Sequence, residues 1–228
     1  MITAEQYLGL DSSHLVSIDE KHALISEVKT VFCSMQDAAS AEGIDLQLVS
    51  SYRSFSKQCQ IWNKKWQGLL PLNTLDGNVL DTSSLDEITK LHAILLWSAL
   101  PGASRHHWGT DIDVYDRNSV ETWQKSTGQK FNLLPSEYEQ GGPCARLSDW
   151  LQSHMAEYGF FRPYHVYRGG VASEPWHLSY QPLADEIIEG YDLSQLESAL
   201  AKHRIDGIDV IFDHLQDIFT RYTLNAGR

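Results

Sequence analysis

The chain has 228 residues, of which 42% are hydrophobic and 21% are charged, with 18 Lys and Arg against 30 Asp and Glu. This length fits one globular domain with its own core, or one domain with an appendage, and the composition excludes a disordered chain. The net charge of −12 disfavours binding to a phosphate backbone or an anionic membrane surface, so no nucleic acid is expected as the main partner.

Hydrophobic spacing and turn residues predict helices, with one strand, in the first half of the chain. Gly43 is expected to end the first helix, and Ser84 is expected to cap the last one. The predicted elements are, in order, a helix over residues 18–42, a strand over 44–51, a helix over 55–66, a polar loop over 68–84 and a helix over 85–100.

In the second half, short strands alternate with helices. The predicted elements are a strand over residues 110–115, a polar loop over 116–143, a helix over 147–158, strands over 160–167 and 176–180, and helices over 193–203 and 208–222. Adjacent late strands with helices on either side are typical of an α+β fold rather than a doubly wound sheet.

The chain shows no signal for membrane insertion or export. Its longest uninterrupted apolar run is Ala93–Trp97, against the roughly 20 residues of a membrane span. The first 30 residues lack a basic stretch followed by an apolar one, which predicts a cytoplasmic location; a periplasmic one would require a leader that has been removed. Three isolated cysteines without a CxxC pattern predict reduced thiols and no cysteine zinc site.

Two short segments place imidazoles beside carboxylates at predicted turns. They are residues 104–113 (SRHHWGTDID) and residues 174–177 (EPWH). His106 and Asp113 are seven residues apart, and β-branched residues oppose a helix there. Their side chains converge only if the chain turns between them, and Trp108-Gly109 is the place for that turn.

Together the two segments supply the ligands of a catalytic metal site. His106, Asp113 and His177 offer three nitrogen or oxygen ligands, and Glu174 is a spare carboxylate. A catalytic zinc site uses three protein ligands, an open fourth position and a base that does not coordinate. No HExxH motif occurs in the chain, so a helix-borne zincin is excluded.

The pattern SxHxxGxxxD over residues 104–113 followed by ExxH over 174–177 resembles the zinc D-Ala-D-Ala peptidases of the vancomycin-resistance carboxypeptidase and dipeptidase type. Those enzymes carry SxHxxGxAxD and then ExxH in a Pro-Trp-His context, and they share a fold with the hedgehog signalling domain. The segment 51–54 (SYRS) with Gln58 resembles their substrate-binding segment. Asp111 departs from the pattern, because the family has a small residue there, usually Ala. Its carboxylate could face the metal pocket, or bind Arg105 or solvent.

The resemblance implies a fold and a division of the chain. It implies an α+β fold with a small antiparallel sheet that carries the zinc site, flanked by helices. Residues 1–182 would form the catalytic domain, with its motif-bearing core at about 45–180. Residues 183–228 would form a helical C-terminal extension packed on the same domain.

The resemblance also implies roles for the metal ligands and the catalytic groups. His106, Asp113 and His177 would hold one zinc ion. Glu174 would take a proton from the attacking water and return it to the leaving amine. Arg53 would meet the substrate carboxylate or the developing oxyanion through its planar donor fork.

Substrate contacts are implied for further residues. Besides Arg53, Ser104 and Gln58 would hydrogen-bond the peptide. Trp108 and Trp176 flank the expected ligands and are candidates for the pocket wall.

The activity implied is that of a zinc-dependent metallopeptidase, a D-alanyl-D-alanine carboxypeptidase that acts on a peptidoglycan stem peptide or another D-Ala-terminated peptide. An L,D-carboxypeptidase, a D,D-dipeptidase or a peptidoglycan endopeptidase of the same fold remains an alternative, as does a non-catalytic zinc-stabilised binding module. Residues 54–57 (SFSK) fit the SxxK motif of penicillin-binding proteins, but no KTG or SDN companion occurs, which excludes the serine mechanism.

Overall fold

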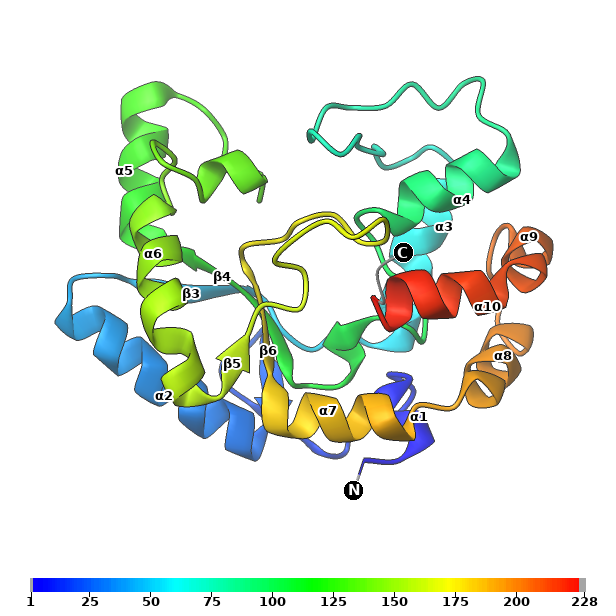
Figure 1. The fold of residues 1–228 in the computed structure, drawn as a ribbon, viewed down its shortest axis with the longest axis horizontal. Coiled ribbons are helices and arrows are strands. Elements are labelled where there is room, and N and C mark those ends of the chain that lie inside the picture. Colours follow the sequence, from blue (N-terminus) through cyan, green and yellow to red (C-terminus); the bar gives the residue numbers. More distant parts are fainter. Residues whose placement is uncertain (1, 226–228) are drawn as a thin grey trace.

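The computed structural model describes residues 2–225 and is built around one four-stranded antiparallel sheet (Figure 1). The strand order is β3-β4-β6-β5. The strands are β3 (Leu46–Ser50), β4 (Asp111–Asp116), β5 (Phe160–Phe161) and β6 (His177–Tyr180). This architecture confirms the predicted α+β class with a small antiparallel sheet.

The two faces of the sheet differ because side chains alternate along each strand. One face is apolar and packs against α2 (Ser26–Ala41) and α6 (Ala145–His154). The buried residues of this core include Val28, Phe32, Met35, Ile112, Val114, Leu147 and Leu178. The opposite face of β4 and β6 carries polar residues, among them Asp111, Asp113, His177 and Ser179, all of them buried.

The predicted helix over residues 18–42 is wrong at its start. A two-stranded hairpin, β1 (Leu15–Ser17) and β2 (Ala23–Ile25), precedes α2. Its turn is closed by Asp19, whose carboxylate accepts hydrogen bonds from the backbone N–H groups of Lys21 and His22 at 2.7 and 2.8 Å. An aspartate that bonds the backbone two residues ahead favours a turn over a helix.

Helix α3 (Phe55–Trp66) has the predicted bounds, whereas α4 (Glu87–Leu95) ends five residues before the predicted end at residue 100. The oxygen that caps α4 belongs to Asp86, which accepts from Thr89 N at 2.7 Å, and not to Ser84. The chain between the two helices is the predicted loop, seen as a wide excursion in Figure 1.

The predicted loop over residues 116–143 contains a helix, so that prediction is wrong in its first part. Helix α5 (Arg117–Thr127) begins directly after β4 and ends at Gly128, whose φ is +70°. Asp116 caps it, with its carboxylate accepting from Ser119 N at 3.3 Å and from Ser119 Oγ at 2.6 Å. Because Val120 is the one buried residue within α5, the helix shows no apolar stripe in the sequence.

The cap predicts the effect of Asp116→Ala on stability. Asp116 is 2% exposed, and alanine would leave the first turn of α5 without its acceptor. We expect a loss of about 1–2 kcal/mol in the free energy of unfolding, measured by urea denaturation. Asp37→Ala on α2, whose carboxylate does not cap that helix, is the control. Equal stability of the two variants would contradict the capping role.

The predicted strand over residues 160–167 is correct for its first two residues only. After Phe161 the chain leaves the sheet, because the buried Arg162 donates to Pro175 O at 2.9 Å and Pro163 has no N–H for the ladder. Residues 162–176 form a loop across the polar face. Before β5, α6 continues into a single turn (Met155–Tyr158).

The remaining helices include α1 (Ala4–Tyr7) and the four after β6. Those four are α7 (Gln181–Gly190), α8 (Leu193–Ala201), α9 (Ile208–Asp213) and α10 (Leu215–Ile218), with a short π-helical turn at Phe219–Thr223. The predicted helix over 208–222 is thus broken at His214, and the predicted helical character of the C-terminal part is confirmed.

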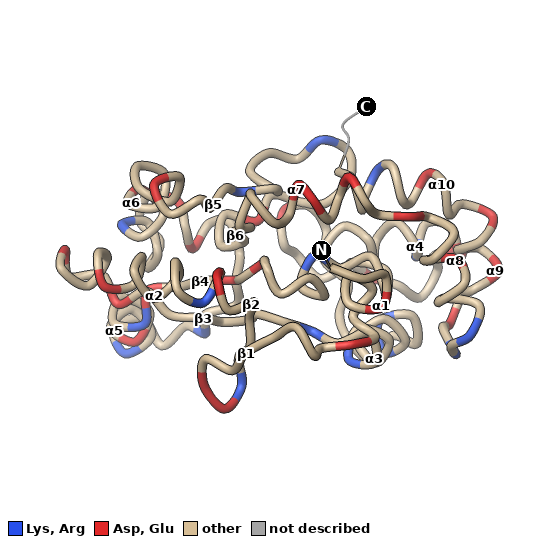
Figure 2. Tube along the Cα trace, turned by 90° about the horizontal axis from the view of Figure 1, so that it is seen from below, with Lys and Arg blue, Asp and Glu red and all other residues tan. Residues whose placement is uncertain are grey.

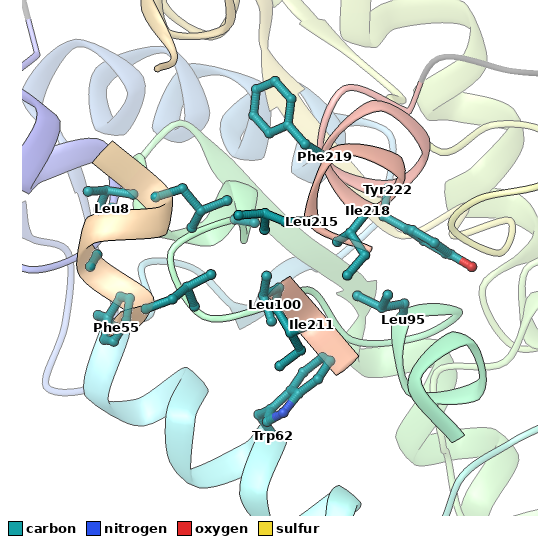
Figure 3. Packing of buried hydrophobic residues seen from close by; sticks show 14 of the residues in the cluster. Leu8, Phe55, Trp62, Leu95, Leu100, Ile211, Leu215, Ile218, Phe219 and Tyr222 are labelled. Carbon is teal, nitrogen blue, oxygen red and sulfur yellow. The ribbon is translucent and has the colours of Figure 1, made fainter. Parts of the chain in front are cut away.

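The C-terminal helices share a second hydrophobic core with α3 and α4 (Figure 3). Trp62 of α3 lies in this core and donates from Nε1 to Asp206 O at 3.0 Å, while Ile211 and Ile218 are fully buried. The boundary at residue 182 stays a prediction, since the core includes residues from both sides of it.

Charge is spread over the outer surface. Figure 2 shows acidic residues along α7 and α10 and in the β1–β2 turn. Among residues 2–225, no helix has the length and apolar character needed to cross a bilayer. The three cysteines are free thiols, as predicted.

Candidate metal centre

Strand pairing brings Asp113 and His177 together. In the antiparallel ladder of β4 and β6, Asp113 lies opposite His177, and Asp111 lies opposite Ser179. Directly opposed residues point to the same face of a sheet with their Cβ atoms about 4.5–5.5 Å apart. His177 Nδ1 accordingly lies 3.0 Å from Asp113 Oδ1.

His106 reaches the same place from a single helical turn, Arg105–His107, that precedes β4. The chain reverses at Gly109, whose φ is +76°. A side chain there would be strained, and its Cβ would meet Leu15 Cδ2 at 2.4 Å. The turn expected at this position is confirmed, and it places His106 Nε2 3.2 Å from Asp113 Oδ2.

These three residues could hold one metal ion. One ligand atom from each of His106, Asp113 and His177 lies within 4.8 Å of the others, and all three residues are buried. The Nδ1–H of His106 donates to Ser51 O at 2.9 Å, and the Nε2–H of His177 donates to Asp111 Oδ1 at 2.9 Å. Each ring therefore turns its other nitrogen toward Asp113.

Two buried atoms of the cluster test whether a cation fits. His177 Nδ1 and Asp113 Oδ1 make no hydrogen bond to any described residue, although they are 3.0 Å apart. Two buried polar atoms this close, one of them a carboxylate oxygen that can only accept, need a shared positive charge between them. That charge is either a second proton on His177 Nδ1 or a bound cation that replaces this proton. The nitrogen and carboxylate donors also match the ligands that zinc prefers.

The charges around the cluster favour the ionised form of Asp113 and the protonated form of His177. Burial opposes ionisation of Asp113, but His106 and His177 hold its pKa well below the usual range. Burial lowers the pKa of His106, so this ring is neutral. For His177 burial is outweighed by Asp111 and Asp113, which raise its pKa to about 10 in the metal-free protein.

Glu174 lies beside the ligands and lines the same cavity. Its backbone N–H donates to Tyr164 O at 2.9 Å, which fixes the loop, and its Oε2 lies 3.6 Å from His177 Nδ1. Burial raises the pKa of Glu174 to about 7. A carboxylate poised near neutrality is the kind of group that accepts and returns a proton.

Arg53 enters the site from the segment between β3 and α3. Its backbone N–H donates to His106 O at 3.0 Å. Its guanidinium donates to Gln58 Oε1 at 3.1 Å and to Ser50 Oγ at 3.2 Å, and no carboxylate of the described residues pairs with it. Gln58 is fully buried, and its amide nitrogen donates to Ala99 O at 2.7 Å. Gln58 therefore fixes the position of the Arg53 guanidinium through this hydrogen bond.

The predicted site residues surround a cavity of about 270 Å³. His106, Asp113, His177, Glu174, Arg53 and Ser104 all line it. Gln58 does not line it, and its predicted contact with substrate stays a prediction. Of the two tryptophans expected at the wall, Trp176 lines the cavity, whereas Trp108 is fully buried beneath Arg105.

The sequence of residues 21–183 matches the profile of VanY, D-alanyl-D-alanine carboxypeptidase. The chain belongs to this family. The match confirms the resemblance inferred from the motifs, and with it a hydrolase of the D-Ala-D-Ala carboxypeptidase type.

Relatives in sequence cover different parts of the chain. An uncharacterized protein of Haemophilus influenzae is 35% identical over 125 residues, which is 54% of this chain and 92% of that protein. The D-alanyl-D-alanine carboxypeptidase of Enterococcus faecalis is 26% identical over 147 residues, covering 63% of this chain and 43% of that enzyme. The chain thus spans less than half the length of that enzyme.

Solved structures share the fold. VanYB in complex with D-Ala-D-Ala is 20% identical with a TM-score of 0.53, and the match covers 85% of this chain and 91% of that one. The vancomycin-resistance D,D-pentapeptidase VanY in complex with Zn(II) is also 20% identical, with a TM-score of 0.52 over 82% of this chain and 88% of that one. The LD-carboxypeptidase LdcB is 26% identical, with a TM-score of 0.52 over 79% of this chain and 74% of that one.

Several groups at the site of this family member were not predicted from the sequence. Lys65 of α3, Tyr164 and Asn132 line the cavity. They come from a helix and two loops and belong to no motif, so only the folded chain places them there. His107, in contrast, is kept out of the cavity, since its ring bonds to Gly102 N and Arg53 O.

Proposed function

We propose that this chain is a zinc-dependent D-alanyl-D-alanine carboxypeptidase, with His106, Asp113 and His177 as the zinc ligands. The observation that carries the proposal is the convergence of these three buried residues, which each offer one ligand atom within 4.8 Å of the others. The carboxylate of Glu174 lies beside them, 3.6 Å from His177 Nδ1. Zinc bound there would polarise the scissile carbonyl and activate the attacking water.

Glu174 is the general base and acid in this proposal. Its carboxylate takes a proton from the attacking water as the amide carbon is attacked. The same carboxyl group then gives the proton to the nitrogen of the leaving D-alanine as the C–N bond breaks. Glu174 lines the same cavity as the three ligands, so its carboxylate lies beside the place of attack.

Two cations support a substrate with a free carboxylate. Arg53 and Lys65 both line the cavity, and neither is paired with a carboxylate within 4 Å among the described residues. Burial lowers the pKa of Lys65 to about 8, so it is mostly charged at neutral pH. In a chain with a net charge of −12, these cations would receive the terminal carboxylate and the oxyanion. Gln58 acts through Arg53, and Ser104 offers a hydroxyl at the wall.

The test is release of D-alanine. Zinc-loaded protein should release D-alanine from a peptide that ends in D-Ala-D-Ala, and a chelator should stop the release until zinc is restored. Product masses from a defined muropeptide panel identify the bond that is cut. Failure to release D-alanine from any of these peptides would contradict the proposal.

An L,D-carboxypeptidase is the second candidate, supported by the likeness to LdcB at 26% identity. The same panel separates it, because an L,D-enzyme cuts tetrapeptide stems and spares D-Ala-D-Ala. A binding module without catalysis has no use for a buried carboxylate at the position of Glu174. The predicted cytoplasmic location stays a prediction, and fractionation of cells that express the tagged chain tests it.

A further inference from the structure

Asp111 is a buried carboxylate directly behind the candidate metal ligands. It lies two residues before Asp113 on the same face of β4 and is fully buried. Oδ1 accepts from Arg105 Nε at 2.8 Å and from His177 Nε2 at 2.9 Å. Oδ2 accepts from Thr110 Oγ1 at 2.6 Å and from Ser179 Oγ at 3.0 Å.

These contacts fix the carboxylate in place. A carboxylate has about four acceptor positions, and all of them are used here. Its charge is balanced by Arg105, which is 5% exposed, donates from Nη2 to Ser179 Oγ at 2.6 Å and stacks on Trp108. Asp111 therefore cannot swing forward to become a fourth ligand without breaking a satisfied buried network.

The two imidazoles of the cluster are oriented by different means. A backbone carbonyl, Ser51 O, receives the Nδ1–H of His106. A side-chain carboxylate, that of Asp111, receives the Nε2–H of His177. The orientation of His177 thus depends on a residue that can be replaced, at a position where the family pattern has a small residue.

We propose that Asp111 is a positioning residue that fixes His177 with its Nδ1 lone pair toward the metal and so slows loss of the ion. A carboxylate behind a metal-bound imidazole sets its tautomer and raises its basicity as a ligand. The inference deepens the proposed function, because it rests on zinc being held by His177. The ion pair with Arg105 favours the ionised form of Asp111 and fixes the position of its carboxylate.

The rate of zinc release tests this role. Zinc-loaded wild type, Asp111→Ala, Asp111→Asn and Asp116→Ala are mixed with excess chelator, and the ion is followed as it leaves. Asp116→Ala is the matched control, because it removes a buried carboxylate from the far end of β4 that touches no ligand. Visible spectra of the Co²⁺-loaded proteins report the ligand geometry independently of activity.

We expect release to be about 10–100-fold faster in Asp111→Ala, with an altered Co²⁺ spectrum. Asp111→Asn keeps an oxygen that can accept from His177, so its release rate should fall between those of Asp111→Ala and wild type. If the alanine variant does not fold, the asparagine variant still tests the inference. Asp116→Ala should match wild type. Release within twofold of wild type in both Asp111 variants would overturn the inference, whereas a wild type that binds no zinc would overturn the proposed function instead.

Discussion

Replacing Glu174 by glutamine should lower kcat for D-alanine release by about 10²–10⁴-fold while leaving the zinc content unchanged. Glutamine has nearly the same shape as glutamate but cannot accept the proton of the attacking water. The zinc content should hold, because Glu174 is not one of the three converging ligands. D-alanine release and metal analysis of the same preparation measure the two effects.

The control is Glu121→Gln on α5, an exposed carboxylate that pairs with Lys125 at 3.7 Å and does not line the cavity. Its kcat should equal that of wild type. A Glu174→Gln enzyme that keeps kcat within tenfold of wild type would show that another group moves the proton. Loss of zinc from this variant would instead make Glu174 a ligand.

Zinc affinity should rise steeply with pH. Burial disfavours a charged His177, yet Asp111 and Asp113 raise its pKa to about 10. Below that pH the metal-free ring carries a proton on each nitrogen, and zinc must displace the one on Nδ1. Each unit of pH below the pKa therefore weakens apparent affinity about tenfold, or about a hundredfold between pH 8.5 and pH 6.5. His106, whose pKa burial lowers, adds no such competition.

Competition with a chelator of known pH dependence measures this slope. Calorimetry at pH 7.5 in two buffers with different ionisation enthalpies should count about one proton released per zinc bound. The His154→Gln variant is the control, because that ring stacks on Trp150 away from the cluster. An affinity that stays flat between about pH 6 and pH 8 would argue against ligation by His177.

Local signals in the sequence were sufficient for much of the fold. The helix Phe55–Trp66 and the strand Asp111–Asp116 stand close to their predicted positions, because apolar periodicity and flanking turn residues act over a few positions. Helix α5 was missed because its stability comes from the Asp116 cap and Gly128 rather than from an apolar stripe. The β1–β2 hairpin was missed because the apolar spacing of α2 continues into Leu24, which is buried from a strand instead.

The candidate site, like the fold, was predicted only in part from the sequence. Motif spacing pointed to His106, Asp113, His177 and Glu174, and the fold brings all of them to one cavity. The roles assigned to them stay predictions until they are measured. Lys65 carries no sequence signal, because its place depends on how α3 packs.

Asp111 illustrates the limit of reading one residue at a time. The sequence left open whether this carboxylate faces the metal pocket or binds Arg105. In the folded chain Asp111 binds Arg105 and does not line the cavity, and the same oxygen also accepts from His177. The contact with His177 could not be predicted from the sequence, because it depends on the pairing of β4 with β6.

The two halves of the active site are supported by different hydrophobic cores. Asp113 and His177 lie on the sheet, and His106 lies on the helical turn just before β4. Lys65 and Gln58, the hydrogen-bond partner of Arg53, belong instead to α3, which packs against helices α8–α10. Those helices lie beyond residue 183, where the family match ends. We therefore expect a substitution in the second core to shift Lys65 and Arg53 more than Asp113 and His177.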